Sequence, residues 1–430
     1  MLDYHDHDHA REPVPTGEGV GGWHIGLIYI GMGLALPAFL VGTQIGTALG
    51  LGATILAIVL SGLILTAVGA TTGAIGAKVR LSTYMITQIT FGRLGANIVN
   101  LLIACAIAGW FGVIVHMFAS SLNSLFIEQF SLDFGITVWS IFGGILMVST
   151  AVWGFQGLDK LSLLAVPLLF GLLIVTNWHI LAETTLSHVL SVPGSGTISF
   201  GVAVSMMASG FIGGAAIMPD ISRYGKTTKD GAIGAMLCFL PGMTVVLTLS
   251  AIPAIAIGEL DIVKVMTGFG WPIASTLVVI MAAWTSNDNN LYSASLGVAS
   301  VVRNAEKWRI TIVIGSVGTL LAVLGIMEKF IPFLNVVGVV TAPMAGTYIA
   351  DYFVRKAEYE RADVDSAPAF RPVALISWAV GSLVALCTLP EAAGGQGIIE
   401  LTTVSALDGL LAGMITLWIF SHGFISSRRA

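Results

Sequence analysis

The chain has 430 residues; 56% are hydrophobic, only 10% are charged, and the net charge is −5. Soluble globular proteins carry about 25% charged residues. This composition, with a mean hydropathy of +0.90, excludes a cytosolic enzyme, a disordered chain, a disulfide-stapled secreted domain and a nucleic-acid-binding protein. Cys105, Cys238 and Cys387 stand singly in apolar runs, without the paired spacing of a metal site or a disulfide framework.

Twelve apolar stretches are long enough to cross a bilayer, since a spanning helix takes about 20 residues. Their only charged residues are Asp288 and Asp408. The sequence therefore predicts an all-α polytopic membrane protein with twelve transmembrane helices, the first of which directs insertion. The predicted spans are 22–48, 51–77, 94–127, 134–156, 161–182, 197–219, 231–257, 271–302, 310–327, 330–350, 372–389 and 402–425.

The basic residues predict the orientation of these spans. If alternate loops are assigned to opposite sides, 17 of the 19 basic residues fall on the side of the N-terminus, and only Lys264 and Lys329 fall on the other. Because basic loops stay in the cytoplasm, both termini are predicted to be cytoplasmic and the location to be the cytoplasmic (inner) membrane. Residues 1–21 are predicted to be a disordered cytoplasmic tail, and 426–430 a second cytoplasmic tail.

Glycine clusters followed by proline occur in the first and sixth spans, at 31–37 and 210–219. Such sequences favour unwound backbone, which within a membrane must line a cavity. Broken helices at matching places in two halves are typical of transporters. We therefore predict two inverted five-helix repeats, 22–182 and 197–350, followed by two additional helices within 372–425. Taken singly, the glycines are equally compatible with close helix packing.

The eighth span carries six consecutive polar side chains at its centre, from Thr285 to Asn290. Polar groups at mid-depth are costly unless they serve a site. The neighbouring hydroxyls of Thr285 and Ser286, together with carbonyls of an unwound helix, suit a monovalent hard cation such as Na⁺. Asp288 is the one ionisable group of the run, and it is interpreted either as a proton carrier or as a structural partner.

Two aromatic residues mark a possible substrate site. Trp110 lies near the centre of the third span between glycines, and Phe211 lies in the glycine cluster of the sixth. Opposed across a cavity, the two rings would hold a flat heteroaromatic ring by stacking, with the amide of Asn287 hydrogen-bonding its edge. Trp110 is also compatible with core packing, and His116 is interpreted as a packed or pore-lining residue.

Three segments together resemble the cytosine permeases of the nucleobase–cation symporter-1 family. They are 109–112 (GWFG), 210–224 with GFI at 210–212, PD at 219–220 and RY at 223–224, and 284–296 (WTSNDNNLYSASL). The resemblance covers essentially the whole chain. It implies a five-plus-five inverted-repeat fold, in which a bundle of helices 1, 2, 6 and 7 rocks against a scaffold. It also implies Na⁺-coupled uptake of a nucleobase.

The resemblance further implies roles for individual residues. Trp110 and Phe211 would enclose the ring, and Asn287 would bind its edge. Na⁺ would take the carbonyls of Gly31, Leu34 and Ala282 and the hydroxyls of Thr285 and Ser286. Gly210 and Gly213 depart from the family pattern, where serines are typical, and would give a larger, less polar pocket.

The sequence leaves alternatives for the function. One is an H⁺-coupled permease for a purine or another heterocycle. A channel or a sensor on the same scaffold is a second, although its polar residues would need to form a continuous stripe rather than a mid-depth cluster. A membrane enzyme is disfavoured, because His116 and Asp288 are too few to form a catalytic set.

Overall fold

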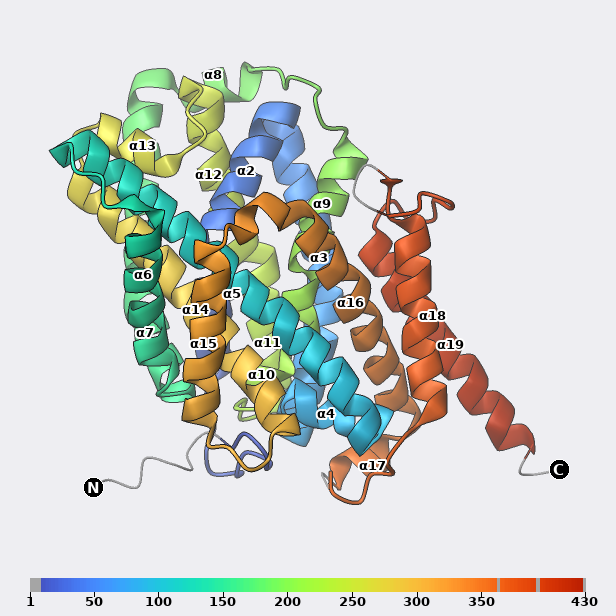
Figure 1. Cartoon of the computed structure of the whole chain (residues 1–430). Helices are drawn as coiled ribbons and strands as arrows, with labels where there is room; N and C mark the ends of the chain where they lie inside the picture. The colour runs from blue at the N-terminus through green and yellow to red at the C-terminus, as the bar shows by residue number, and fades with distance from the viewer. Residues whose placement is uncertain (1–8, 362–363, 392–394, 428–430) are drawn as a thin grey trace, which may run out of the picture.

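The computed structural model describes residues 9–361, 364–391 and 395–427. Within these ranges the chain is helical apart from loops and one isolated bridge. Each predicted span contains one long helix or a run of consecutive helices (Figure 1). They are α1 Gly22–Gly33 with α2 Leu36–Leu49, α3 Leu51–Val79, α5 Arg93–Phe130, α6 Gly135–Ala151, α7 Phe155–Thr184, α9 Phe200–Ala216 with α10 Pro219–Ser222, α11 Thr228–Leu237 with the π-helix η1 Cys238–Gly242 and α12 Met243–Ile257, α14 Pro272–Val301, α15 Lys307–Val323, α16 Phe330–Val354, α18 Pro372–Thr388 and α19 Ser405–Ser427.

Short helices connect the long ones. They are α4 Thr83–Phe91, α8 Leu186–Ser191, α13 Ile262–Gly268, α17 Lys356–Glu360 and the 3-10 turn η2 Ile326–Lys329. Residues 9–20 and the end of α19 lie toward one end of the molecule, and α2, α8 and α13 lie toward the other (Figure 1).

The outer surface is apolar, as a lipid-facing surface requires. Among the described residues, five helices are long and apolar enough to cross a membrane, and the bent pair α1–α2 makes a sixth. Large hydrophobic side chains project outward from α6 and α7, where Ile145 is 68% exposed and Trp178 is 78% exposed. The chain is therefore a multi-pass membrane protein.

Two groups of helices meet at the centre. Helices α1, α2, α3, α9, α10, α11 and α12 pack on one another, and we call them the bundle. Helices α5, α6, α14 and α15 form the scaffold, in which α5 runs against α14. Helices α18 and α19 pack on α16 and on each other at the periphery (Figure 1).

The first span is broken as expected. Helix α1 ends at Gly33, α2 begins at Leu36, and the two helices bend by 69°. Leu34 and Ala35 have non-helical backbone angles, and Pro37 lies in the first turn of α2. Proline is well placed there because the first N–H groups of a helix have no intrahelical acceptor.

The sixth span breaks at the proline end of the expected segment 210–219, not at its glycines. The glycines at 210–214 lie inside regular helix α9, and the interruption falls at Ile217 and Met218, before α10. Pro219 explains this position, because in a continuous helix its ring would clash with the carbonyl oxygen four residues earlier. Proline, rather than glycine, sets the break.

The N-terminal segment differs from the disordered tail expected for 1–21. Residues 1–8 lie outside the described residues, as do 428–430 of the predicted C-terminal tail. Residues 9–20, which we call the strap, cross the ends of α3, α10 and α14, and Val14 is only 1% exposed. Val20 pairs with Gly225 in a parallel bridge.

Three arginines hold the strap. Arg11 donates from Nε to Ala299 O (3.1 Å), at the end of α14 in the scaffold. Arg80, at the end of α3, donates to Val14 O (2.6 Å) and Glu18 O (2.6 Å). Arg223 donates to His9 O (2.6 Å) and to the hydroxyl of Tyr292 on α14 (2.8 Å). The strap thus contacts both the bundle and the scaffold.

Candidate substrate and ion site

Hydroxyl and carbonyl oxygens gather where α1 ends against the middle of α14. Thr285 Oγ1 lies 3.1 Å from Gly31 O and 3.5 Å from Ala282 O. Ser286 Oγ lies 2.9 Å from Met32 O and 3.4 Å from Gly31 O. The structure therefore brings together four of the five residues predicted to bind the ion. The fifth, Leu34, is fully buried three residues beyond Gly31, directly after α1.

This oxygen cluster has more carbonyl acceptors than hydroxyl hydrogens to donate to them. The two hydroxyls supply one hydrogen each, yet Thr285 Oγ1 also lies 2.9 Å from Met281 O. The last carbonyls of α1 have no intrahelical donor, and the C-terminal end of a helix carries partial negative charge. A small cation would bind here through neutral oxygens. Gly31 also lets α1 pack closely on α7, because a Cβ there would lie 3.2 Å from Ser162 Oγ and from Val166 Cγ2 of that helix.

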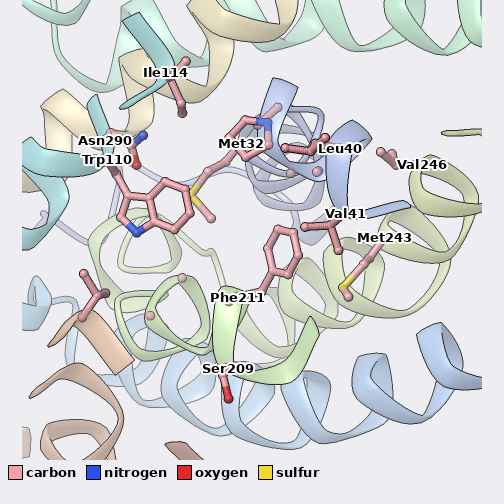
Figure 2. A pocket seen from close by; sticks show the side chains of 18 of the residues that line it. Met32, Leu40, Val41, Trp110, Ile114, Ser209, Phe211, Met243, Val246 and Asn290 are labelled. Carbon is pink, nitrogen blue, oxygen red and sulfur yellow. The ribbon is translucent and has the colours of Figure 1, made fainter. Parts of the chain in front are cut away.

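Beside this cluster, a cavity of about 690 Å³ lies between the bundle and the scaffold. Trp110 from α5 and Phe211 from α9 both line it, as do Gly210 and Gly213 (Figure 2). The ring of Trp110 also meets Phe333 edge-on, with centroids 5.8 Å apart. The two predicted stacking residues therefore share one cavity.

Gly210 leaves open space beside the cavity. A Cβ there would meet no atom within 4 Å, whereas one on Gly213 would meet Thr341 Oγ1 at 3.5 Å. Neither glycine is needed for close helix packing. The space is consistent with the larger, less polar pocket expected from the missing serines.

On α14, the amide that lines the cavity is that of Asn290, not that of the predicted Asn287. Asn287 is fully buried and donates from Nδ2 to Phe111 O (3.1 Å). Asn290 Nδ2 in turn donates to Asn287 Oδ1 (3.3 Å). Asn287 thus holds the side chain that faces the cavity. Both belong to the polar run of α14. The sequence feature that could have pointed to Asn290 is this run as a whole.

The two ionisable groups singled out in the sequence pack between scaffold helices. Asp288 is fully buried and accepts from Thr150 Oγ1 of α6 (3.0 Å), and Trp284 Nε1 donates to the same hydroxyl (2.7 Å). Asp288 Oδ2 has no hydrogen-bond partner among the described residues. His116 Nδ1 lies 2.9 Å from Ala322 O of α15, as expected of a packed histidine.

Two groups of helices surround a central cavity, and one group contains a broken span. This arrangement is typical of a membrane transporter. Residues 15–412 match the family model described as a permease for cytosine/purines, uracil, thiamine and allantoin. The chain belongs to this family, the nucleobase–cation symporter-1 family. It is a nucleobase- or hydantoin-type transporter, not an enzyme.

Known proteins support the same conclusion. The cytosine permease of Escherichia coli (strain K12) is 28% identical over 377 residues, which are 87% of this chain and 88% of that one. The fold matches a nucleobase-cation-symport-1 family transporter in a closed conformation with bromovinylhydantoin bound, with a TM-score of 0.81, 20% identity, and coverage of 97% and 95% of the two chains. A substrate-bound, outward-open Na⁺-coupled sialic acid symporter matches with a TM-score of 0.71, 16% identity, and coverage of 98% and 93%. The predicted family and the twelve-helix, five-plus-five inverted-repeat fold are confirmed.

Proposed function

We propose that this protein takes up cytosine or a similar flat, nucleobase-like heterocycle by Na⁺-coupled symport. The observation that carries the proposal is the oxygen cluster formed by Gly31, Thr285 and Ser286 beside a cavity lined by Trp110 and Phe211. In the proposed topology the repeats are 22–182 and 197–350, 372–425 adds two helices, and both termini are cytoplasmic in the inner membrane.

In the proposed mechanism, Na⁺ binds first and joins α1 of the bundle to α14 of the scaffold. Carbonyls of Gly31, Leu34 and Ala282 and the hydroxyls of Thr285 and Ser286 are its ligands. Joining the two units orders the cavity, and the ring then stacks between the two aromatic side chains. Differential binding of both solutes to the two conformations couples their movement.

The ring edge is bound by Asn290 in this proposal, and Asn287 positions it. An amide offers both a donor and an acceptor, which matches the alternating N–H and C=O groups of a nucleobase or a hydantoin. Gly210 and Gly213 leave room for the ring in this proposal and offer it no hydroxyl groups.

The available driving force is sufficient for concentrative uptake. One charge crossing about 100 mV yields roughly 2.3 kcal/mol. A tenfold Na⁺ gradient adds about 1.4 kcal/mol. Together these support roughly 500-fold accumulation of a neutral solute with one-to-one coupling.

A thermal-shift panel of pyrimidines, purines and hydantoins, with and without Na⁺, tests the proposal. We expect at least one flat ring to stabilise the purified protein, and Na⁺ to raise its affinity. In proteoliposomes, that ring should accumulate against its gradient when Na⁺ is placed outside. Passive equilibration would indicate a channel, and binding without any transport would indicate a sensor.

Proton coupling is the second candidate, because Asp288 is buried in α14 and one of its carboxylate oxygens has no hydrogen-bond partner within the described part of the chain. Uptake would then be indifferent to Na⁺ and would collapse when a protonophore is added. Asp288→Asn would abolish accumulation in that case, whereas it leaves Na⁺-driven uptake in place under the first proposal.

A further inference from the structure

The strap joins the bundle to the scaffold at one end of the molecule. Figure 1 shows it in dark blue, at the end opposite α2, α8 and α13. Along α14, Asn290 lines the cavity, and Tyr292 accepts a hydrogen bond from Arg223 of the bundle. Farther along the same helix, Ala299 O accepts a hydrogen bond from Arg11 of the strap. Since each helical residue rises 1.5 Å, the strap contacts α14 about 13 Å beyond the cavity.

On the bundle side, the strap is held largely through its backbone. Val14 N donates to Arg80 O (3.0 Å), and Val20 N donates to Tyr224 O (2.7 Å). Lys226 N donates in return to Val20 O (3.1 Å). The guanidinium of Arg80 adds hydrogen bonds to further carbonyls of the strap. Because all these bonds would have to break together, the strap stays with the bundle when the bundle moves.

On the scaffold side, the strap uses the side chain of Arg11. The guanidinium donates to Ala299 O (3.1 Å), Val302 O (3.0 Å) and Ala305 O (2.6 Å). Helix α14 ends at Val301, and the last carbonyls of a helix lack intrahelical donors and favour a cation. The bonds to Val302 and Ala305 are exposed, so water can replace the guanidinium there. This attachment is therefore reversible.

The strap is also tied to itself. His9 Nδ1 lies 3.0 Å from Glu12 Oε1, and His9 Nε2 lies 2.9 Å from Glu18 Oε2. Val14, between the two glutamates, is buried against the rest of the molecule. Since its two ends are joined through His9, the strap moves as one body. Release of Arg11 then detaches this body from the end of α14.

We propose that the strap is a latch, which keeps the cavity closed toward the strap side of the membrane while Arg11 binds the end of α14. Arg11 must leave α14 before the bundle can move away from the scaffold and open the cavity to that side. In the proposed topology, that side is the cytoplasm. The latch rests on the two-conformation mechanism proposed above, but it acts with any ring and any coupling ion. Arg11 lies before residue 15, where the match to the family model begins, so the latch belongs to this chain's own N-terminal segment.

Two thiols report the release of the strap and the opening of the cavity separately. Val14 is 1% exposed, so the thiol of Val14→Cys reacts only when the strap leaves its position. The native Cys238 lines the cavity and is 4% exposed, so it reacts from the strap side only when the cavity opens there. Cys105 and Cys387 are not among the described residues that line the cavity, and they serve as internal references.

Labelling is measured on the full-length protein in inside-out and right-side-out membrane vesicles, with a membrane-impermeant methanethiosulfonate and peptide mass spectrometry. Arg11→Ala should raise the labelling rates of Val14→Cys and of Cys238 from the strap side about fivefold, since it removes the hydrogen bonds of one charged, partly exposed group. The labelling rate of Cys238 from the opposite side should fall.

Arg303→Ala is the matched control. Arg303 lies two residues after the end of α14 and has the same charge as Arg11, but its Nη1 donates to Asp365 Oδ1 (3.0 Å). Its removal therefore takes one positive charge from the same end of the molecule and leaves the contacts of Arg11 in place. Arg303→Ala should change neither labelling rate, and an equal rise in both variants would overturn the latch.

The remaining outcomes are also decisive. If Arg11→Ala raises the labelling of Val14→Cys but not that of Cys238, the strap is a passive attachment and the latch is wrong. If neither thiol becomes more reactive, Arg11 does not hold the strap and the latch is wrong as well. A rise in both with reagent on the outer side supports the latch and reverses the proposed topology. Na⁺-driven uptake by the wild-type protein is measured separately, so the proposed function can stand when the latch fails.

Discussion

The ion half and the ring half of the site are built in opposite ways. The ion half is a tight cluster of buried oxygens, with Ser286 Oγ 2.9 Å from Met32 O. The ring half is a cavity of about 690 Å³ in which Gly210 has open space beside it. A small cation needs close, fixed oxygens, whereas a cavity between two units can accept rings of different size. Under the proposed function, selectivity for the ion would therefore depend on backbone geometry, and selectivity for the ring would depend on side-chain volume.

The strongest test of this contrast removes the oxygens of the ion half. Thr285→Ala combined with Ser286→Ala should weaken Na⁺ binding about 100-fold, since each lost hydroxyl ligand costs about 1.4 kcal/mol. Na⁺-driven uptake should fall to background, and ring affinity should become independent of Na⁺. The exchange Thr285→Ser with Ser286→Thr retains both hydroxyls and should retain coupling. Undiminished Na⁺ dependence in the alanine double variant would show that the ion binds elsewhere.

The next effect concerns the aromatic part of the ring half. Trp110→Ala should weaken ring binding about 30-fold, because stacking on an aromatic side chain contributes about 1–3 kcal/mol. Trp110→Phe should restore most of the affinity. Phe333→Leu is the control for the edge-on contact with Trp110 and should have a smaller effect. The stacking role would be refuted by a Trp110→Ala protein that binds the ring as tightly as wild type.

Variants of the two asparagines should distinguish the residue that binds the ring edge from the residue that supports it. Asn290→Ala is expected to weaken ring binding about tenfold with little change in melting temperature, because it removes one hydrogen bond to the ligand. Asn287→Ala removes a buried hydrogen bond to Phe111 O and should lower the melting temperature by several degrees. If only Asn287→Ala changes affinity at unchanged stability, Asn287 is the residue that binds the ring edge.

The smallest expected effect lies in the glycines of α9. Gly210→Ser should shift preference toward small polar rings by about three- to fivefold, since it adds a hydroxyl and reduces the space. Gly201→Ser on the same helix is the control, because Gly201 also has open space but does not line the cavity. Equal ligand rankings in both variants would remove Gly210 from specificity.

The same contrast explains how much the sequence could predict. The proximity of Thr285 and Ser286 to the end of α1 was predictable, because neighbouring hydroxyls at mid-membrane and a Gly–Pro break are both local signals. Asn290 was missed in favour of Asn287 because the rotation of α14 relative to α5 is fixed by side-chain contacts such as the one from Asn287 to Phe111. The break in the sixth span was predicted within 210–219 from a glycine cluster followed by proline, and it falls at the proline end because Pro219 determines it through backbone sterics.

The strap was missed for a different physical reason. Its segment is polar and short, which is typical of disordered chain. Two distant arginines, Arg80 and Arg223, donate to its carbonyls, and carbonyl acceptors are the same for every residue type. The residue types within 9–20 therefore give no sign of these two sets of contacts.

This mode of attachment has an evolutionary consequence. Arg80 and Arg223 bind the peptide backbone of the strap, so most side chains between residues 10 and 20 can be substituted without loss of these hydrogen bonds. Its length has no such freedom, because inserting or deleting one residue moves every following carbonyl by about 3.3–3.6 Å relative to its guanidinium. Among descendants of this sequence, substitutions should accumulate in the strap while insertions and deletions are eliminated.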